Sequence, residues 1–227
     1  MQRPPWLLPQ PDARRTPEMI DEFDGMFDDI QQRSSGTRIE YPGRFPKWQF
    51  LSYVAQVHGV VLHGSYEPCI AEVEPRQADD VRAYSAQRAI YATTDGIWAI
   101  FFAILDRRGH PMSLANTCLR IRDESGELSE PFYYFSITQS ALDAEPWCEG
   151  AVYILSREGF SQESPRRLGP VDVEFPHWIG RQAATPLAYL PVGPGDFPFL
   201  EEIRGHDDAE LRRRYEEDPG GFPWEES

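Results

Sequence analysis

The chain has 227 residues with 37 acidic and 22 basic side chains, which gives a formal net charge of −15 at pH 7. This length is enough to bury a sizeable core in one large domain. The strong negative charge argues against nucleic acid as a partner, because phosphate binding requires a basic surface. The single lysine, Lys47, among many arginines fits a GC-rich bacterial genome.

The cysteines and the apolar stretches exclude several further classes of protein. The three cysteines are widely spaced and match neither a disulfide framework nor a zinc pattern, so no metal site is predicted. No GxSxG elbow or glycine-rich phosphate loop occurs. The N-terminus is rich in proline, and the longest apolar stretch, residues 97–105, is too short to span a bilayer. We therefore expect a cytoplasmic protein with no membrane partner.

Residues 1–57 are predicted to form an extended arm followed by two helices. Thr16 and Pro17 are typical of an N-cap and a first helical position. Apolar residues then recur at helical spacing, namely Met19, Ile20, Phe23, Met26, Phe27 and Ile30. This pattern predicts an N-terminal amphipathic helix with an acidic outer face, and packing on the core is favoured over binding a partner. A shorter helix is expected near residues 48–55.

Polar and aromatic residues lie at the ends of two predicted strands in the next part of the chain. An apolar, β-branched segment predicts a short buried strand that ends at His63. Gly64 would let a ligand approach the backbone, and Ser65 adds a hydroxyl. A second predicted strand presents Tyr91, which completes a possible cradle for a flat polar heterocycle with an attached sugar. The alternative is that His63 is a core histidine and Tyr91 a sheet aromatic.

The polar loop at residues 77–88 is expected to form a rim or lid over the cradle. The apolar segment 97–105 predicts a buried helix that Thr94 or Asp95 could cap.

From residue 112 onward the pattern predicts strands, at residues 117–121, 132–137, 152–155 and 187–192. A mixed first half and a β-rich second half predict an α+β fold, with two small, mostly antiparallel sheets that form a cleft between flanking helices. We expect residues 58–205 to be the core. Residues 206–227 would form a charged, frayed tail.

This part of the chain resembles the NAD-binding half of ADP-ribosyltransferase folds. The likeness rests on the tripeptide His63-Gly64-Ser65, on the strand with Tyr91-Ala92-Thr93, and on the Ala- and Phe-rich helix that follows. The likeness is to the diphtheria-toxin and poly(ADP-ribose) polymerase branch, whose signature is His, Tyr and a later Glu. The same stretch is more distantly similar to tRNA 2′-phosphotransferases, although the acidity of the chain argues against that branch.

The resemblance implies that NAD is the substrate and assigns a role to each residue of the cradle. His63 would bond the adenosine-side ribose, the Gly64 backbone would hold the nicotinamide amide, and the catalytic Tyr91 would stack on the nicotinamide ring. The resemblance also makes Ser65 and Thr93 NAD-binding residues, through the hydroxyls beside His63 and Tyr91.

Arg76 could reach the pyrophosphate as a bidentate fork, or it could be a solvated surface arginine.

A catalytic carboxylate is the last part that the resemblance implies. ADP-ribosyl transfer passes through an oxocarbenium-like transition state, which a nearby carboxylate stabilises. Glu174 lies at about the right distance before the final core strand and is the first candidate. Because Pro176 and Gly180 interrupt this region, His177 could hold the aligned position instead, and Glu158 is a second candidate.

Two classes of function follow. The first is an NAD-dependent ADP-ribosyltransferase-like enzyme that transfers ADP-ribose to an unknown protein or small-molecule acceptor. The alternative is a non-catalytic acidic protein, similar to bacterial immunity and antitoxin proteins, that keeps the fold and covers a basic partner. A glutamate within reach of both His63 and Tyr91 would distinguish them.

Overall fold

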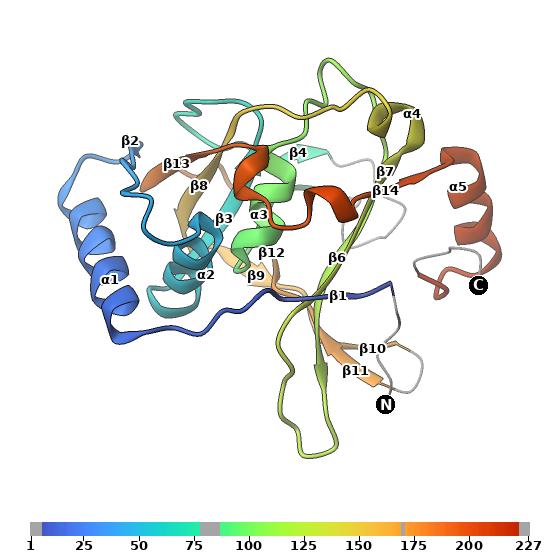
Figure 1. The fold of residues 1–227 in the computed structure, drawn as a ribbon, viewed down its shortest axis with the longest axis horizontal. Helices are drawn as coiled ribbons and strands as arrows, with labels where there is room; N and C mark the ends of the chain where they lie inside the picture. The colour runs from blue at the N-terminus through green and yellow to red at the C-terminus, as the bar shows by residue number, and fades with distance from the viewer. Residues whose placement is uncertain (1–5, 78–86, 169–170, 223–227) are drawn as a thin grey trace.

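The computed structural model describes residues 6–77, 87–168 and 171–222, and it combines two multi-stranded sheets with helices α1 to α5 (Figure 1). The larger sheet has the strand order β2-β13-β8-β3-β5-β12-β9, with β4 beside β5. The smaller sheet has the order β1-β7-β6-β11-β10, with β14 beside β7. The β2–β13 and β14–β7 pairs are parallel and the other pairs antiparallel. The mixed class with two sheets is confirmed, but the sheets are larger than expected.

The strands of the larger sheet are β2 (Thr37–Arg38), β3 (Val60–Ser65), β4 (Arg76–Gln77), β5 (Arg88–Thr93), β8 (Gly150–Ser156), β9 (Phe160–Gln162), β12 (His177–Gly180) and β13 (Ala188–Val192). Those of the smaller sheet are β1 (Leu8–Pro9), β6 (Leu114–Arg122), β7 (Phe132–Thr138), β10 (Arg166–Leu168), β11 (Val171–Glu174) and β14 (Arg204–His206). His63 and Tyr91 therefore lie within their strands rather than at the strand ends, because pairing with β8 and β12 extends β3 and β5.

The helices are α1 (Pro17–Gln32), α2 (Lys47–Val57), α3 (Gly96–Ala103), α4 (Gln139–Leu142) and α5 (Asp208–Glu217). The Thr16 side chain caps α1 by accepting a hydrogen bond from the backbone N–H of Met19 at 3.3 Å. α1 and α2 lie at one end of the molecule and α5 at the other (Figure 1). Within the described residues, every helix is too short or too polar to cross a membrane.

The helix predicted at residues 97–105 ends earlier than expected. α3 stops at Ala103, and Leu105 instead forms a β-bridge with Trp147. Within α3, Phe101 is fully buried whereas Phe102 is only half-buried. The central part of the predicted lid, residues 78–86, lies outside the described residues.

The main core surrounds α3, which lies at the centre of the molecule (Figure 1). It joins buried residues of α1 and α2 to residues of both sheets, so these two helices share one core with the rest of the described chain. Phe101 illustrates this, because its ring lies 4.6 Å from that of Phe135 on β7 and 5.8 Å from that of Phe197.

Two glycines let α3 approach the larger sheet closely. A Cβ added to Gly64 on β3 would lie 1.9 Å from the carbonyl oxygen of Ala99, and one added to Gly150 on β8 would lie 2.0 Å from that of Ala103. The backbone of α3 therefore rests directly on these two strands. Gly64 is needed for helix packing whether or not a ligand binds beside it.

We expect Gly64→Ala to destabilise the protein by at least about 1–3 kcal/mol, the usual cost of overpacking, because the clash is with backbone rather than a flexible side chain. Gly25→Ala is the matched control. Gly25 lies inside α1 with open space around its Cβ position, so alanine there should raise the free energy of unfolding by roughly 0.5–1 kcal/mol. Urea denaturation of both variants measures the difference. Equal stability of the two variants would contradict this packing.

Asp95, one of the two residues predicted to cap this helix, is the N-cap of α3. Its carboxylate accepts hydrogen bonds from the backbone N–H of Trp98 at 2.8 Å and from the hydroxyl of Tyr133 at 2.8 Å. The side chain is only 2 % exposed, and this burial raises its pKa above the ordinary value. The carboxylate is therefore satisfied by hydrogen bonds but costly to ionise.

The raised pKa of Asp95 predicts a pH effect on stability. Because the pKa of Asp95 is higher in the native than in the unfolded state, its contribution to the free energy of unfolding is greatest below about pH 4. This contribution is lost as pH rises through the native pKa. We expect the stability of wild type relative to Asp95→Asn to fall over that window. Asp95→Ala, which removes the cap, should lower the free energy of unfolding by about 0.5–2 kcal/mol, with a further loss because the Tyr133 hydroxyl loses the acceptor for its proton. Denaturant titrations from pH 4 to 8 test this, and a pH-independent difference between wild type and Asp95→Asn would refute it.

Candidate functional site

The candidate site lies where β3 and β5 separate. The two strands pair at one position within the described residues, Leu62 with Thr93. Beyond it, His63 to Ser65 pair with β8 on their other side, while β5 pairs with β4 from Ala89. The edge of β3 that faces β5 therefore has no described strand partner over His63–Ser65, which leaves a split in the sheet.

The side chain of His63 bridges this split. Its Nδ1 lies 2.7 Å from the backbone carbonyl oxygen of Tyr91. Because a carbonyl oxygen only accepts hydrogen bonds, Nδ1 must carry the proton, and Nε2 then presents a lone pair. Burial lowers the pKa of His63, which favours the neutral ring. The site thus contains a fixed, neutral hydrogen-bond acceptor suited to a hydroxyl donor.

The rings of His63 and Tyr91 lie on opposite faces of the larger sheet. The neighbours of Tyr91 on β5, Ile90 and Ala92, pack in one cluster with Val61 of β3. Because side chains alternate along a strand, His63 shares the face of Val61, and the Tyr91 ring points to the other face, toward α3. Tyr91 thus meets His63 through its backbone.

Tyr91 is held by contacts on the α3 side. Its hydroxyl donates to the carbonyl oxygen of Gln87 at 2.5 Å and accepts from the N–H of Gln87 at 3.2 Å. Its ring stacks on His177 of β12, with centroids 5.8 Å apart, and His177 also meets Trp98 of α3 edge-on. These contacts fix the Tyr91 ring on the α3 side of the sheet.

The other predicted binding residues have structural partners. Ser65 and Thr93 are buried, and their hydroxyls accept hydrogen bonds from the backbone N–H groups of Glu67 and Asp95, respectively. Arg76 is exposed and lies 3.2 Å from a carboxylate oxygen of Glu67.

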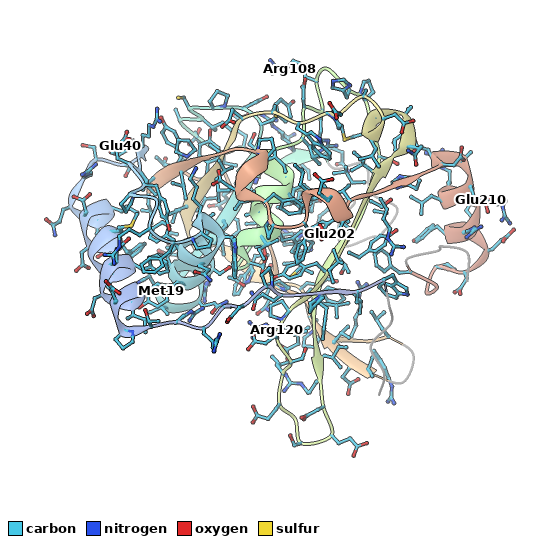
Figure 2. All side chains as sticks on the ribbon, in the orientation of Figure 1. Met19, Glu40, Arg108, Arg120, Glu202 and Glu210 are labelled. Carbon is cyan, nitrogen blue, oxygen red and sulfur yellow. The ribbon has the colours of Figure 1, made fainter. Side chains whose placement is uncertain are left out.

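Arg108 pairs with the second oxygen of Glu67 at 3.4 Å, and Figure 2 shows it in the loop after α3. Glu67 also contributes its carbonyl oxygen to the Tyr153 hydroxyl at 2.6 Å. Arg76 and Arg108 therefore converge on one carboxylate close to the strand of His63, which provides two guanidinium groups for an anion.

The predicted carboxylates lie apart from Tyr91. Glu174 is on β11 of the smaller sheet, where it forms an ion pair with Arg122 of the neighbouring strand β6. Glu158 is exposed in the turn between β8 and β9. The structure therefore does not bring either one into contact with the two rings.

A different carboxylate reaches Tyr91 through His177. Nδ1 of His177 lies 3.1 Å from Oε2 of Glu163, and both side chains are nearly buried, at 13 % and 11 % exposed. The second oxygen of Glu163 lies 3.5 Å from Arg166. Sequence reasoning considered His177 but missed Glu163, because a glutamate in a polar, proline-containing segment carries no signal of its own.

A series of contacts thus crosses the neighbouring strands β3, β5 and β12, and it joins His63, Tyr91, His177 and Glu163 in that order.

Within the described ranges, no group of histidine, cysteine and acidic residues is arranged to hold a metal ion. No protein-family model, curated protein or solved structure matches this chain.

Proposed function

We propose that the protein binds NAD⁺ at the split between β3 and β5 and transfers ADP-ribose to an acceptor, with the cleft of the fold at this position. The observation that carries the proposal is the hydrogen bond between His63 Nδ1 and the Tyr91 carbonyl oxygen. It ties together the two residues of the predicted signature and leaves Nε2 of His63 as an acceptor for a ribose hydroxyl.

Neighbouring groups support the same ligand. The backbone edge at Gly64 has no described strand partner toward β5, so its polar groups suit a nicotinamide amide. Arg76 and Arg108 supply guanidinium groups that match a pyrophosphate, for which they would leave Glu67. Tyr91 supplies the aromatic surface, and its ring must turn toward the split to stack on nicotinamide.

In the proposed reaction the N-glycosidic bond to nicotinamide breaks through an oxocarbenium-like transition state. The carboxylate that stabilises this charge is proposed to be Glu174, as the resemblance implies, with Glu163 as the candidate that contact geometry favours. For Glu174 to act, it must exchange Arg122 for the ribose.

A thermal shift tests binding. NAD⁺ at about a hundred times its dissociation constant should stabilise the wild type by about 2.7 kcal/mol. His63→Ala should abolish the increase in melting temperature, whereas His110→Ala, which changes a loop histidine, should retain it. If millimolar NAD⁺ shifts neither wild type nor His110→Ala, the proposal fails.

The exposed acidic residues of α1 favour the alternative, a non-catalytic protein that covers a basic partner. They are Glu18, Asp21, Asp28 and Asp29. Under this alternative the same titration gives no shift with NAD⁺ in any variant. The two proposals are therefore separated by one measurement.

A further inference from the structure

Glu67 places a carboxylate at the two arginines that the proposed function assigns to a pyrophosphate. Its Oε2 lies 3.2 Å from Nη2 of Arg76, and its Oε1 lies 3.4 Å from Nη2 of Arg108. Each carboxylate oxygen therefore serves a different guanidinium group. An anion from solution that binds the same two guanidinium groups has to take the place of this side chain.

The backbone of Glu67 is held in place just after β3. Its N–H donates a hydrogen bond to Oγ of Ser65 at 3.1 Å, and its carbonyl oxygen accepts one from the Tyr153 hydroxyl at 2.6 Å. Pro68 follows, and a residue before proline is restricted to extended backbone. The carboxylate is therefore kept near the two arginines by the chain itself, so it competes at a high effective concentration.

The two arginines extend from fixed backbone on different elements. Arg76 lies on β4, where it pairs with Ala89 of β5. Arg108 lies in the turn after α3 (Figure 2), where its backbone N–H donates to Oδ1 of Asp106 at 3.2 Å. The side chains of Arg76 and Arg108 are 68 % and 75 % exposed, so an anion from solution can reach both guanidinium groups without movement of the backbone.

Glu67 and Arg76 lie close enough to His63 for their charges to act on its ring. Burial is the main cause that lowers the pKa of His63, and its hydrogen bond to Tyr91 opposes this. Smaller contributions come from Arg76, which lowers the pKa, and from Glu67, which raises it. The carboxylate and its arginines therefore belong to the neighbourhood of the proposed nucleotide site.

We propose that Glu67 is an internal competitor for an anion site formed by Arg76 and Arg108, so that an anionic ligand binds only by displacing its carboxylate. Without ligand, the carboxylate occupies both guanidinium groups. A diphosphate carries more charge and more oxygen atoms than a carboxylate, and it can therefore replace it. That the natural ligand is the pyrophosphate of NAD⁺ rests on the proposed function, whereas the competition itself does not.

Titration calorimetry with inorganic pyrophosphate, in metal-free buffer at constant ionic strength, tests the competition on the intact protein. An internal competitor raises the apparent dissociation constant by the reciprocal of the fraction of sites that it leaves free. Two exposed ion pairs can make this factor as large as roughly thirtyfold. Glu67→Gln keeps both backbone hydrogen bonds of this position, and it should bind pyrophosphate at least about threefold more tightly than wild type.

Glu72→Gln is the matched control, because it removes one negative charge from an exposed residue of the same loop. Its dissociation constant for pyrophosphate should stay close to that of wild type. The proposal is overturned if Glu67→Gln gains less than about threefold in affinity, if Glu72→Gln gains as much, or if neither wild type nor Glu67→Gln binds pyrophosphate.

Two further comparisons separate the competition from other effects. In a protein with both Arg76→Gln and Arg108→Gln, the additional change Glu67→Gln should give no gain in pyrophosphate affinity, and a gain that persists would overturn the proposal. Tighter pyrophosphate binding by Glu67→Gln without any thermal shift by NAD⁺ would reject the proposed function alone. A thermal shift by NAD⁺ with unchanged pyrophosphate affinity in Glu67→Gln would reject the competition alone.

Discussion

Phe101→Ala is expected to be the most destabilising single truncation considered, at about 3–5 kcal/mol, the range for a fully buried phenylalanine. Its ring is inaccessible to solvent and contacts the rings of Phe135 and Phe197, so truncation leaves a cavity that the surrounding rings cannot readily fill. Urea denaturation at neutral pH measures the loss in free energy of unfolding.

Phe102→Ala and Tyr91→Ala are the comparisons. Both side chains are half-buried, so their truncation should cost clearly less than that of Phe101. The buried helix predicted over residues 97–105 makes Phe102 a core residue, and its partial exposure corrects that prediction. If Tyr91→Ala proves as destabilising as Phe101→Ala, Tyr91 is a core aromatic and cannot line an open site.

The second large effect concerns the carboxylate of the proposed reaction. Glu174→Gln keeps the shape of the side chain but removes its charge, so NAD⁺ affinity should stay near that of wild type. If Glu174 faces the oxocarbenium, NAD⁺ cleavage should fall on the order of a hundredfold or more. Nicotinamide release at saturating NAD⁺ measures the rate.

Glu163→Gln is the matched variant. It leaves the ion pair of Glu174 with Arg122 intact but removes the charge that partners His177. A rate loss in Glu163→Gln with normal turnover in Glu174→Gln would move the carboxylate role to Glu163. Normal turnover in both variants would make Glu158 the remaining candidate for the catalytic carboxylate. If the wild type binds NAD⁺ but does not cleave it, the non-catalytic alternative is favoured.

Features encoded by neighbouring residues were predicted well. Thr16 and Asp95 cap their helices as expected, because a cap depends on a side chain and a backbone N–H three residues away. The apolar segment that includes Phe101 is buried as expected, since a helix that is apolar on all sides cannot face water.

Features created by strand pairing were not predicted. Glu163 meets His177 because β9 pairs with β12, and His206 meets Ser113 because β14 joins β7, across long separations in the chain. His63 is adjacent to Tyr91, but the alternation of side chains places their rings on opposite faces. Only the register of β3 and β5 determines that arrangement.

A crystal structure with an unreactive NAD⁺ analogue tests the central claim most directly. We predict that the adenosine-side ribose lies within hydrogen-bonding distance of His63 Nε2, in the split between β3 and β5, and that the Tyr91 ring has turned to stack on nicotinamide. An analogue bound elsewhere, or no bound analogue at saturating concentration with the His63–Tyr91 contact unchanged, would contradict the account.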